Sequence, residues 1–339
     1  MPQIQAICVV IAARNASATI GRAVASALAE PETAEVVVID DGSTDTTSAA
    51  AKAVDDDSGR LRILRFEKNR GPAAARNAAI ACSSSPFIAI LDADDFFVPG
   101  RFGRLLADNE WDFVADNIAF IEESRVTGAP PAIPEFHPQP RLIDLESFVE
   151  GNISRRGVRR GEIGFLKPVM RRAFLESNEL RYREDLRLGE DYELYVRALA
   201  KGARYRLIHA CGYCAVVRSD SLSGRHRTED LRRLYEADRA ILADSSLSEA
   251  TVAVLRRHER HIRAKYELRH FLDLKNGSGP LAAIRYALAR PAALAAIGSG
   301  ILADKTERFR RPVRTGATAH LDSPGLRYLL SAVPVSAQR

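Results

Sequence analysis

The chain has 339 residues, a length that suits one large domain or two modest ones. A hydrophobic fraction of 46% and a charged fraction of 27% are those of a soluble globular protein, and they exclude a disordered or fibrous class. The net charge of +5 is compatible with an anionic ligand or a membrane surface, but no basic stripe interleaved with aromatic residues indicates nucleic acid. Four cysteines are too few for a disulfide framework, and no secretory signal is evident, so we expect a cytoplasmic protein.

The first hundred residues alternate short apolar stretches with helix-prone ones. The predicted strands are residues 7–12, 35–39, 61–66 and 87–91, and the predicted helices are residues 16–28, 44–54 and 72–82. Continuous apolar strands, each followed by a helix, indicate a parallel sheet covered on both faces. We therefore predict a doubly wound α/β fold with a mostly parallel sheet, whose ligands bind beyond the carboxyl ends of the strands.

The pattern changes after residue 108. Residues 109–163 are irregular, with one predicted strand at 113–121 and a proline-rich connection of the kind that is usually functional or mobile. Regular structure returns at 167–176, and a helix begins near Asp191 and ends at Gly202. Beyond about residue 227 we expect helix to the end. The predicted organisation is a domain over 1–225, with halves 1–108 and 109–225, and a helical C-terminal region over 226–339.

Polar residues follow each predicted strand of the first half. They are Asn15, the segment 40–45 (Asp-Asp-Gly-Ser-Thr-Asp), the segment 69–72 (Asn-Arg-Gly-Pro) and the segment 92–95 (Asp-Ala-Asp-Asp). Each one alone is also typical of a turn or a helix cap. Because all four lie at the same edge of one predicted sheet, we interpret them together as a binding site.

The chemistry of these residues suits a sugar nucleotide. Asp40 can accept a hydrogen bond from the imide N–H of a base, and Arg76 can place a positive charge near the phosphates. A departing diphosphate needs a divalent cation, and Asp92-x-Asp94 at a strand end aims two carboxylates at one Mn²⁺ or Mg²⁺ site.

A second acidic site lies about a hundred residues on, at Gly189-Glu190-Asp191. Transfer to a sugar hydroxyl needs a carboxylate that takes the hydroxyl proton, and Asp191 is our candidate for that base. A helix cap is the alternative interpretation of Asp191. Glu184 and Asp185, just upstream, are acidic alternatives that we expect to be solvated.

With these residues in view, the chain resembles the family-2 glycosyltransferases, which have the GT-A fold. The resemblance spans about residues 5–220, and the segments that carry it are 37–45, 69–77, 91–95 and 189–192. It implies that Asp40 contacts uracil, Asp92 the donor ribose or sugar, Asp94 the metal, and that Asp191 is the base of an inverting displacement. The donor-binding residues expected on these grounds are Asn15, Asp40, Asp41, Asn69, Arg76 and Asp92. Glu190, Arg218 and His226 are expected on the acceptor or diphosphate side, with His226 also considered as a metal ligand and as a surface residue.

The resemblance also bears on the product. The first strand ends in Ala-Ala-Arg-Asn rather than the family's frequent Pro-x-Tyr-Asn, and the Gln-x-x-Arg-Trp motif of processive synthases is absent. We therefore expect one sugar per encounter. The chain looks most like bacterial exopolysaccharide glucosyltransferases of the succinoglycan type, which implies a UDP-sugar donor, UDP-glucose above others, and a saccharide or lipid-linked acceptor.

Other interpretations remain open at this point. One is a non-catalytic nucleotide-sugar-binding or scaffolding protein; another is a nucleotidyltransferase, although residues 13–20 contain no glycine for a phosphate loop. Cys211 and Cys214 form a CxxC motif that we interpret as part-buried thiols, because a zinc site would need a second pair. The apolar segment 280–303, followed by a basic run at 305–314, indicates either peripheral contact with anionic lipid or a packed helix.

Overall fold

The computed structural model describes residues 6–126, 133, 141–154, 163–217, 227–290, 293–298 and 326–330. The chain forms two compact units, Met1–Ser221 with Leu321–Arg339, and Leu222–His320. Residues 326–330 therefore belong to the first unit, whereas the sequence analysis assigned 226–339 to a helical C-terminal region. The division of the first unit into halves stays a prediction.

The first unit begins with four parallel strands and three helices. They are β1 (Ile7–Ala13), α1 (Ile20–Leu28), β2 (Thr33–Asp41), α2 (Thr47–Lys52), β3 (Leu61–Phe66), α3 (Pro72–Cys82) and β4 (Phe87–Ile90). The strands are ordered β3-β2-β1-β4, and all three pairings are parallel. This confirms the predicted doubly wound arrangement of alternating strands and helices.

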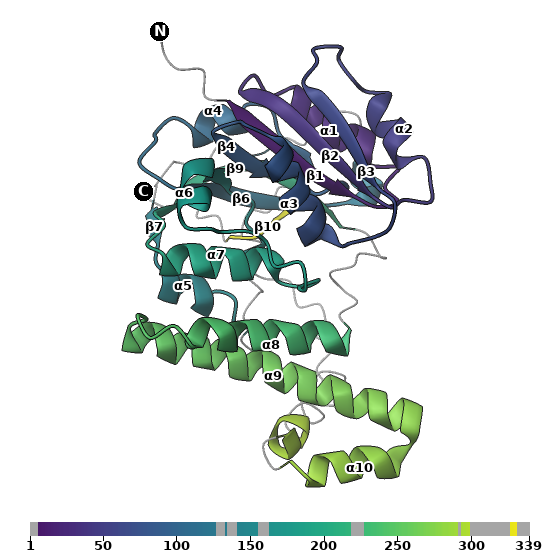
Figure 1. Ribbon diagram of the computed structural model, residues 1–339, viewed down its shortest axis with the longest axis vertical. Helices are drawn as coiled ribbons and strands as arrows, with labels where there is room; N and C mark the ends of the chain where they lie inside the picture. Colours follow the sequence, from purple (N-terminus) through teal and green to yellow (C-terminus); the bar gives the residue numbers. More distant parts are fainter. Residues whose placement is uncertain are drawn as a thin grey trace, which may run out of the picture. The chain divides into compact units, whose positions relative to one another are not determined.

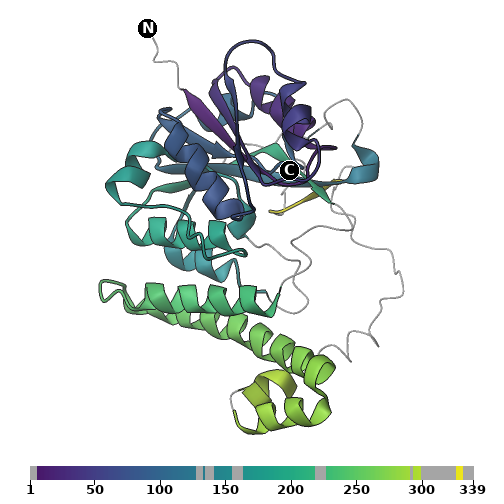
Figure 2. The same ribbon diagram turned by 45° about the vertical axis from the view of Figure 1, so that its right-hand side comes forward.

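The strand order places a ligand site between β1 and β4. Because crossovers between parallel strands are right-handed, α1 and α2 cover one face of the sheet and α3 covers the other, as Figures 1 and 2 show. The central strand β1 is buried along nearly its whole length, which explains its unbroken apolar sequence. The chain reverses its winding direction between β1 and β4, and the carboxyl ends of such strands are where ligands are expected to bind.

The sheet continues with antiparallel members. The further elements of the unit are β5 (Phe96–Phe97), α4 (Arg101–Leu105), β6 (Phe113–Glu122), η1 (Glu123–Arg125), β7 (Arg141–Ile143), α5 (Leu145–Glu150), η2 (Ile163–Phe165), β8 (Val169–Arg171), α6 (Arg172–Ser177), α7 (Glu190–Ala200), β9 (Tyr205–Val217) and β10 (Leu326–Tyr328). The full order is β3-β2-β1-β4-β8-β6-β9-β5, with β7 on β9 and β10 on β6. β6 and β9 pair in parallel, whereas β5, β7, β8 and β10 pair antiparallel with their neighbours, so the sheet as a whole is mixed.

Two expectations need correction here. The sequence predicted helix to the C-terminus, but residues Leu326–Tyr328 form β10, in which Leu326 and Tyr328 are buried and Arg327 is exposed. This alternation is the period of a strand rather than of a helix. The strand β9 was not predicted, because polar residues such as Arg206 and His209 interrupt its apolar pattern.

The second unit is helical, as predicted. It contains α8 (Thr228–Leu242), α9 (Glu249–Ser278) and α10 (Pro280–Leu288), and α8 and α9 lie side by side (Figures 1 and 2). Tyr235 and Tyr266 meet edge to face at 5.4 Å between ring centroids, and a buried His258 lies 2.7 Å from Asp238. Among the residues that the structure describes, every helix is too short or too polar to cross a bilayer.

Candidate functional site

The loops after β1 and β2 are tied together by hydrogen bonds. Asn15 has a positive φ of 49°, and its Oδ1 accepts from the backbone N–H of Thr44 at 2.8 Å. Its own N–H donates to Ser43 Oγ at 3.0 Å. An exposed Asn15 therefore stands at the predicted crevice, on a loop whose shape is fixed by its neighbour.

Asp40 is too enclosed in this conformation to make its predicted contact with a base. It is 0% exposed; its Oδ1 accepts from the N–H of Ser43 at 2.8 Å, and its Oδ2 accepts from Ser48 Oγ at 2.5 Å and Arg65 Nη1 at 3.0 Å. Burial raises the pKa of Asp40, but these hydrogen bonds and the charge of Arg65 outweigh it and lower the pKa below its ordinary value. In this conformation Asp40 stabilises the loop after β2, and it has no surface open to a ligand.

Asp41 and Asn69 hold the start of α3. Asp41 accepts from the N–H groups of Arg70 at 2.7 Å and Gly71 at 2.8 Å, and Asn69 Oδ1 accepts from the same Gly71 N–H at 2.9 Å. Asp41 is buried, while Asn69 is exposed. Of these two predicted donor-binding residues, only Asn69 presents its side chain to solvent.

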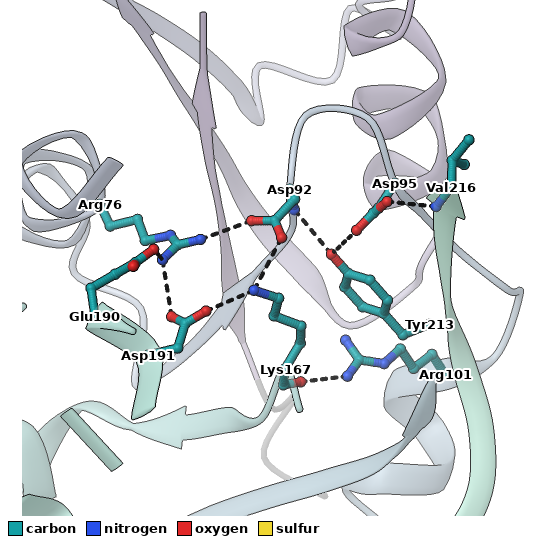
Figure 3. Close-up of polar contacts among 9 residues, drawn as sticks. All are labelled: Arg76, Asp92, Asp95, Arg101, Lys167, Glu190, Asp191, Tyr213 and Val216. Carbon is teal, nitrogen blue, oxygen red and sulfur yellow. Dashed lines mark hydrogen bonds and ion pairs between the residues drawn. The ribbon is translucent and has the colours of Figure 1, made fainter. Parts of the chain in front are cut away.

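Four side chains close a ring of alternating charge, which we call the charge ring: Arg76, Asp92, Lys167 and Asp191 (Figure 3). Arg76 Nη2 donates to Asp92 Oδ1 at 2.8 Å, and its Nη1 donates to Asp191 Oδ1 at 2.9 Å. Lys167 Nζ lies 3.0 Å from Asp92 Oδ2 and 2.7 Å from Asp191 Oδ2. The ring thus joins α3, the loop after β4, the residues before β8 and the first turn of α7.

The charge ring is buried except at Asp92. The side chains of Arg76, Lys167 and Asp191 are 5%, 7% and 12% exposed, whereas that of Asp92 is 34% exposed. Burial raises the pKa of Asp92, but the charges of Lys167 and Arg76 prevail and hold it well below its usual range. A ligand would therefore meet the ring first at an ionised Asp92.

Glu190 adds a third carboxylate to Arg76. Its Oε1 accepts from Arg76 Nη1 at 2.9 Å. Burial raises the pKa of Glu190, and the neighbouring charge of Asp191 adds to that rise while Arg76 opposes it.

Lys167 stays charged at neutral pH. Burial lowers the pKa of its ammonium, but the charges of Asp191 and Asp92 more than reverse this and raise the pKa above its ordinary value.

The alternative that Asp191 caps its helix is wrong. The N-cap residue of α7 is Gly189, with φ 74°, and no side chain makes a capping hydrogen bond there. Asp191 lies one position inside the helix, and its carboxylate points into the charge ring (Figure 3). Upstream, Glu184 and Asp185 are 48% and 43% exposed and pair with arginines, which confirms that they are solvated.

The loop after β4 carries the predicted metal residue. Asp94 is half-buried, and its backbone carbonyl accepts from Arg22 Nη2 at 2.8 Å. The buried Asp95 accepts from the Tyr213 hydroxyl and from the N–H of Val216, both at 2.8 Å (Figure 3). Burial, together with the charges of Asp94 and Asp92, raises the pKa of Asp95 well above its usual range. The loop thus carries three carboxyl groups in four residues, and carboxylate oxygens are the donors that Mn²⁺ and Mg²⁺ prefer.

The structure leaves some predicted residues untested. Arg218, His226 and the basic run at 305–314 lie outside the described residues. Within the part of the chain that is described, no three His, Cys, Asp or Glu side chains gather as they would around a metal ion. Cys211 and Cys214 are buried free thiols, and burial raises the pKa of Cys214 to about 12, as suits core residues without redox chemistry.

Sequence reasoning missed Lys167. A single lysine before a short strand has no spacing that indicates a site. Tyr213 was noted only as part of the segment after Cys211, but its hydroxyl accepts from the N–H of Asp92 at 3.1 Å and donates to Asp95. The apolar residues around Tyr213 could have suggested such a role, because the hydroxyl of a buried tyrosine needs a partner.

Comparisons with known proteins bear on the family of the chain and on its fold. The family model described as Glycosyl transferase family 2 matches residues 8–176. The chain is 67% identical over 330 residues to the succinoglycan biosynthesis protein ExoU of Rhizobium meliloti (strain 1021), covering 97% of this chain and 96% of that protein.

Two solved structures are similar in fold. The structure of S. aureus TarS 1-349 in complex with UDP-GlcNAc aligns with a TM-score of 0.58 at 21% identity, over 86% of this chain and 80% of that one. The mannosyltransferase PcManGT from Pyrobaculum calidifontis, in complex with GDP-Man and Mn²⁺, aligns with a TM-score of 0.52 at 17% identity, over 89% and 82%. These likenesses concern the fold, and they confirm the predicted GT-A-like architecture.

Proposed function

The chain belongs to glycosyl transferase family 2 and is a glycosyltransferase, and on that premise we propose that it moves one glucose from UDP-glucose onto a lipid-linked exopolysaccharide intermediate with inversion. The relative that is 67% identical is named for succinoglycan biosynthesis, which supports an exopolysaccharide product. The UDP-GlcNAc in the TarS structure supports a UDP-sugar, although PcManGT was solved with GDP-Man.

One observation carries the proposal, namely that the charge ring joins Asp92 to Asp191. Asp92 follows β4 at the ligand crevice, and Asp191 lies in the first turn of α7. Arg76 and Lys167 each contact both carboxylates, so a donor-side group and a candidate base lie within one bonded network. A transferase needs such an arrangement, because the acceptor hydroxyl must be activated next to the donor sugar.

The proposed reaction is a single displacement. The acceptor hydroxyl oxygen attacks the anomeric carbon opposite the diphosphate, the bond from that carbon to the diphosphate oxygen breaks, and its electron pair leaves with UDP. The hydroxyl proton passes to the carboxylate of Asp191. Each carboxylate oxygen can accept more than one hydrogen bond, so Oδ2 of Asp191 can receive the hydroxyl while it remains bonded to Lys167.

On the donor side we assign binding to the exposed groups at the strand ends. Asn15, Asn69 and Asp92 present side chains to solvent there, and Arg76 supplies a fixed positive charge behind Asp92. Asp40 and Asp41 stabilise the loops that carry these groups. Contact between Asp40 and uracil, as the family likeness implies, would require Ser48 or Arg65 to release its carboxylate.

We assign the divalent cation to Asp94. The carboxyl groups of the loop after β4 support this, as does the Mn²⁺ in the PcManGT structure. When bound, the ion neutralises charge on the departing diphosphate. Glu190 is assigned to the acceptor side through its bond to Arg76, and Arg218 and His226 remain predicted residues of the diphosphate side.

A panel of nucleotide sugars tests the function. We expect UDP release from UDP-glucose with Mn²⁺ or Mg²⁺, and incorporation of labelled glucose into lipid-linked oligosaccharides extracted from an exopolysaccharide-producing bacterium. Calorimetry with UDP, GDP and dTDP plus Mn²⁺ should rank UDP tightest. A tenfold preference for GDP, about 1.4 kcal/mol, would refute the donor assignment. Donor binding without hydrolysis or transfer would favour the non-catalytic scaffolding function instead.

A further inference from the structure

Lys167 stands apart from the other members of the charge ring because no motif of the sequence points to it. Its ammonium is the only group in the ring that bonds the second oxygen of both carboxylates, at 3.0 Å from Asp92 Oδ2 and 2.7 Å from Asp191 Oδ2. Arg76 already bonds Oδ1 of each. Lys167 therefore fixes the rotation of both carboxylates. With Arg76 alone on Oδ1, each carboxylate could still rotate.

The backbone of Lys167 is itself held from the interior. Arg101 Nη2 donates to the carbonyl oxygen of Lys167 at 2.6 Å, and the same guanidinium bonds Asp116 Oδ1 through Nε at 3.1 Å and Nη2 at 2.9 Å. Arg101 and Asp116 are 0% and 1% exposed. Since both partners are buried, their pairing holds the Arg101 guanidinium at one place in the interior. At that place it bonds the carbonyl of Lys167 (Figure 3).

The charges explain why a lysine is needed between the two aspartates. Asp92 and Asp191 both bond the same nitrogen, so their carboxylates lie close enough to repel each other, and without Lys167 only Arg76 would offset this repulsion. The side chain of Lys167 is 7% exposed, and so little solvent screens this repulsion. Removing the ammonium should separate the donor-side carboxylate from the proposed base.

We propose that Lys167 is a positioning residue that sets Asp191 against the donor-side Asp92, so that the acceptor hydroxyl is aligned with the anomeric carbon. This inference rests on the proposed function, in which Asp191 is the base. It predicts an effect that a purely structural lysine would lack. Hydrolysis of the donor by water needs only the donor-side groups, among which Asp92 keeps its bond to Arg76 when Lys167 is replaced. Transfer to an acceptor also needs Asp191 in register with them.

The test compares Lys167→Met with Lys167→Arg in the full chain. Using UDP-glucose labelled in the glucose, Mn²⁺ and extracted lipid-linked oligosaccharides, we would measure UDP affinity, label released to water and label transferred to lipid. For Lys167→Met we expect transfer to fall about 10- to 100-fold and hydrolysis to fall by no more than about threefold. Lys167→Arg keeps a cation that can bond both carboxylates, and it should recover most of the transfer.

Lys201→Met serves as the control, because Lys201 is an exposed lysine at the end of α7 and lies outside the ring. If Lys167→Met failed to fold, Lys167→Gln would replace it, since the amide keeps N–H donors without the charge. Transfer within about twofold of wild type, or equal losses of transfer and hydrolysis, would overturn the inference. Failure of the wild-type chain to transfer any sugar would instead refute the proposed function.

Discussion

Asp191 allows the proposed base to be tested by replacing one carboxylate oxygen with an amide NH₂ group. Asp191→Asn keeps the size of the side chain but cannot take a proton, so we expect transfer to fall by about 10²–10⁴-fold. In this variant the amide NH₂ faces either Arg76 or Lys167, and that cation loses its hydrogen-bond acceptor. A buried donor without an acceptor should cost about 1–3 kcal/mol of stability. Steady-state transfer rates and a thermal melt measure both effects.

The control for this substitution is Asp185→Asn, since Asp185 is an exposed carboxylate that pairs with Arg183 outside the ring. It should change neither transfer nor stability appreciably. Transfer by Asp191→Asn at close to the wild-type rate would make Glu190 the next candidate. A loss of UDP binding comparable with the loss of transfer would place Asp191 in the nucleotide site instead.

Asp94 provides a second test, which concerns the metal. Asp94→Ala should abolish the dependence of donor hydrolysis on Mn²⁺, because the proposed ion loses its protein ligand. The fold should survive, since Asp94 is half-buried and its backbone carbonyl can keep its bond to Arg22 in the variant. Circular dichroism checks the fold and nucleotide release checks activity. Full wild-type activity in excess EDTA would contradict the assignment.

The role of a residue could be predicted from the sequence only where the residue follows a strand or begins a helix. Asp92 and Asp191 were found because one follows a strand and the other begins a helix, and the structure brings both into one network. The enclosure of Asp40 was not predictable, because Ser48 and Arg65 reach it from separate elements. Lys167 was missed for the same reason: its partners lie 75 and 24 positions away in the sequence.

At the scale of elements, the loops after β2 and β3 approach so closely that only glycine fits at position 42. Gly42 has φ +66°, and a Cβ there would lie 2.8 Å from the backbone nitrogen of Asn69 and 2.9 Å from the carbonyl carbon of Lys68. The left-handed conformation should cost Gly42→Ala about 1–2 kcal/mol, and the clash should add about 1–3 kcal/mol. UDP affinity should also fall, because the displaced loop carries Asn69.

Gly59→Ala is a matched control for Gly42→Ala. Gly59 has a similar φ of +74°, but a Cβ there would meet nothing within 4 Å. It should therefore show the conformational cost alone and leave UDP affinity unchanged. Denaturant unfolding and calorimetry with UDP compare the two variants. Equal effects on both measurements would show that the close approach of the loops is unimportant for donor binding.

The ends of elements show where sequence patterns stop being informative. β3 and α3 begin and end as predicted, because alternating or apolar residues and Pro72 mark their limits. α1 was predicted from residue 16 but begins at Ile20. The N–H groups of Ala16 and Ser17 before it bond the side chains of Thr47, in α2, and Asp45. Local propensity does not predict such contacts between segments that are distant in the sequence.

At the scale of the whole molecule, the second unit carries an apolar face that its own helices leave open. Leu281, Ile284 and Leu288 of α10 are 83%, 50% and 68% exposed, and their spacing places them on one side of the helix. On the other side, Ala283 and Ala287 are buried. The basic run at 305–314, whose structure is not described, follows this face in the sequence. An apolar face that is followed in the sequence by basic residues suits a membrane surface that carries anionic lipid, where a lipid-linked acceptor would also lie.

We therefore predict that the full chain floats with vesicles containing anionic phosphatidylglycerol and that salt weakens this binding. Burying a leucine fully is worth about 1.5–3 kcal/mol, so replacing both Leu281 and Leu288 by Ser should reduce the bound fraction by at least about tenfold. Leu142→Ser is the control, because Leu142 is 63% exposed on β7 of the first unit. Equal binding to neutral vesicles would contradict the electrostatic part of the prediction. If no vesicle bound and the same substitutions instead dissociated an oligomer in sedimentation, the face would serve contact between protein subunits.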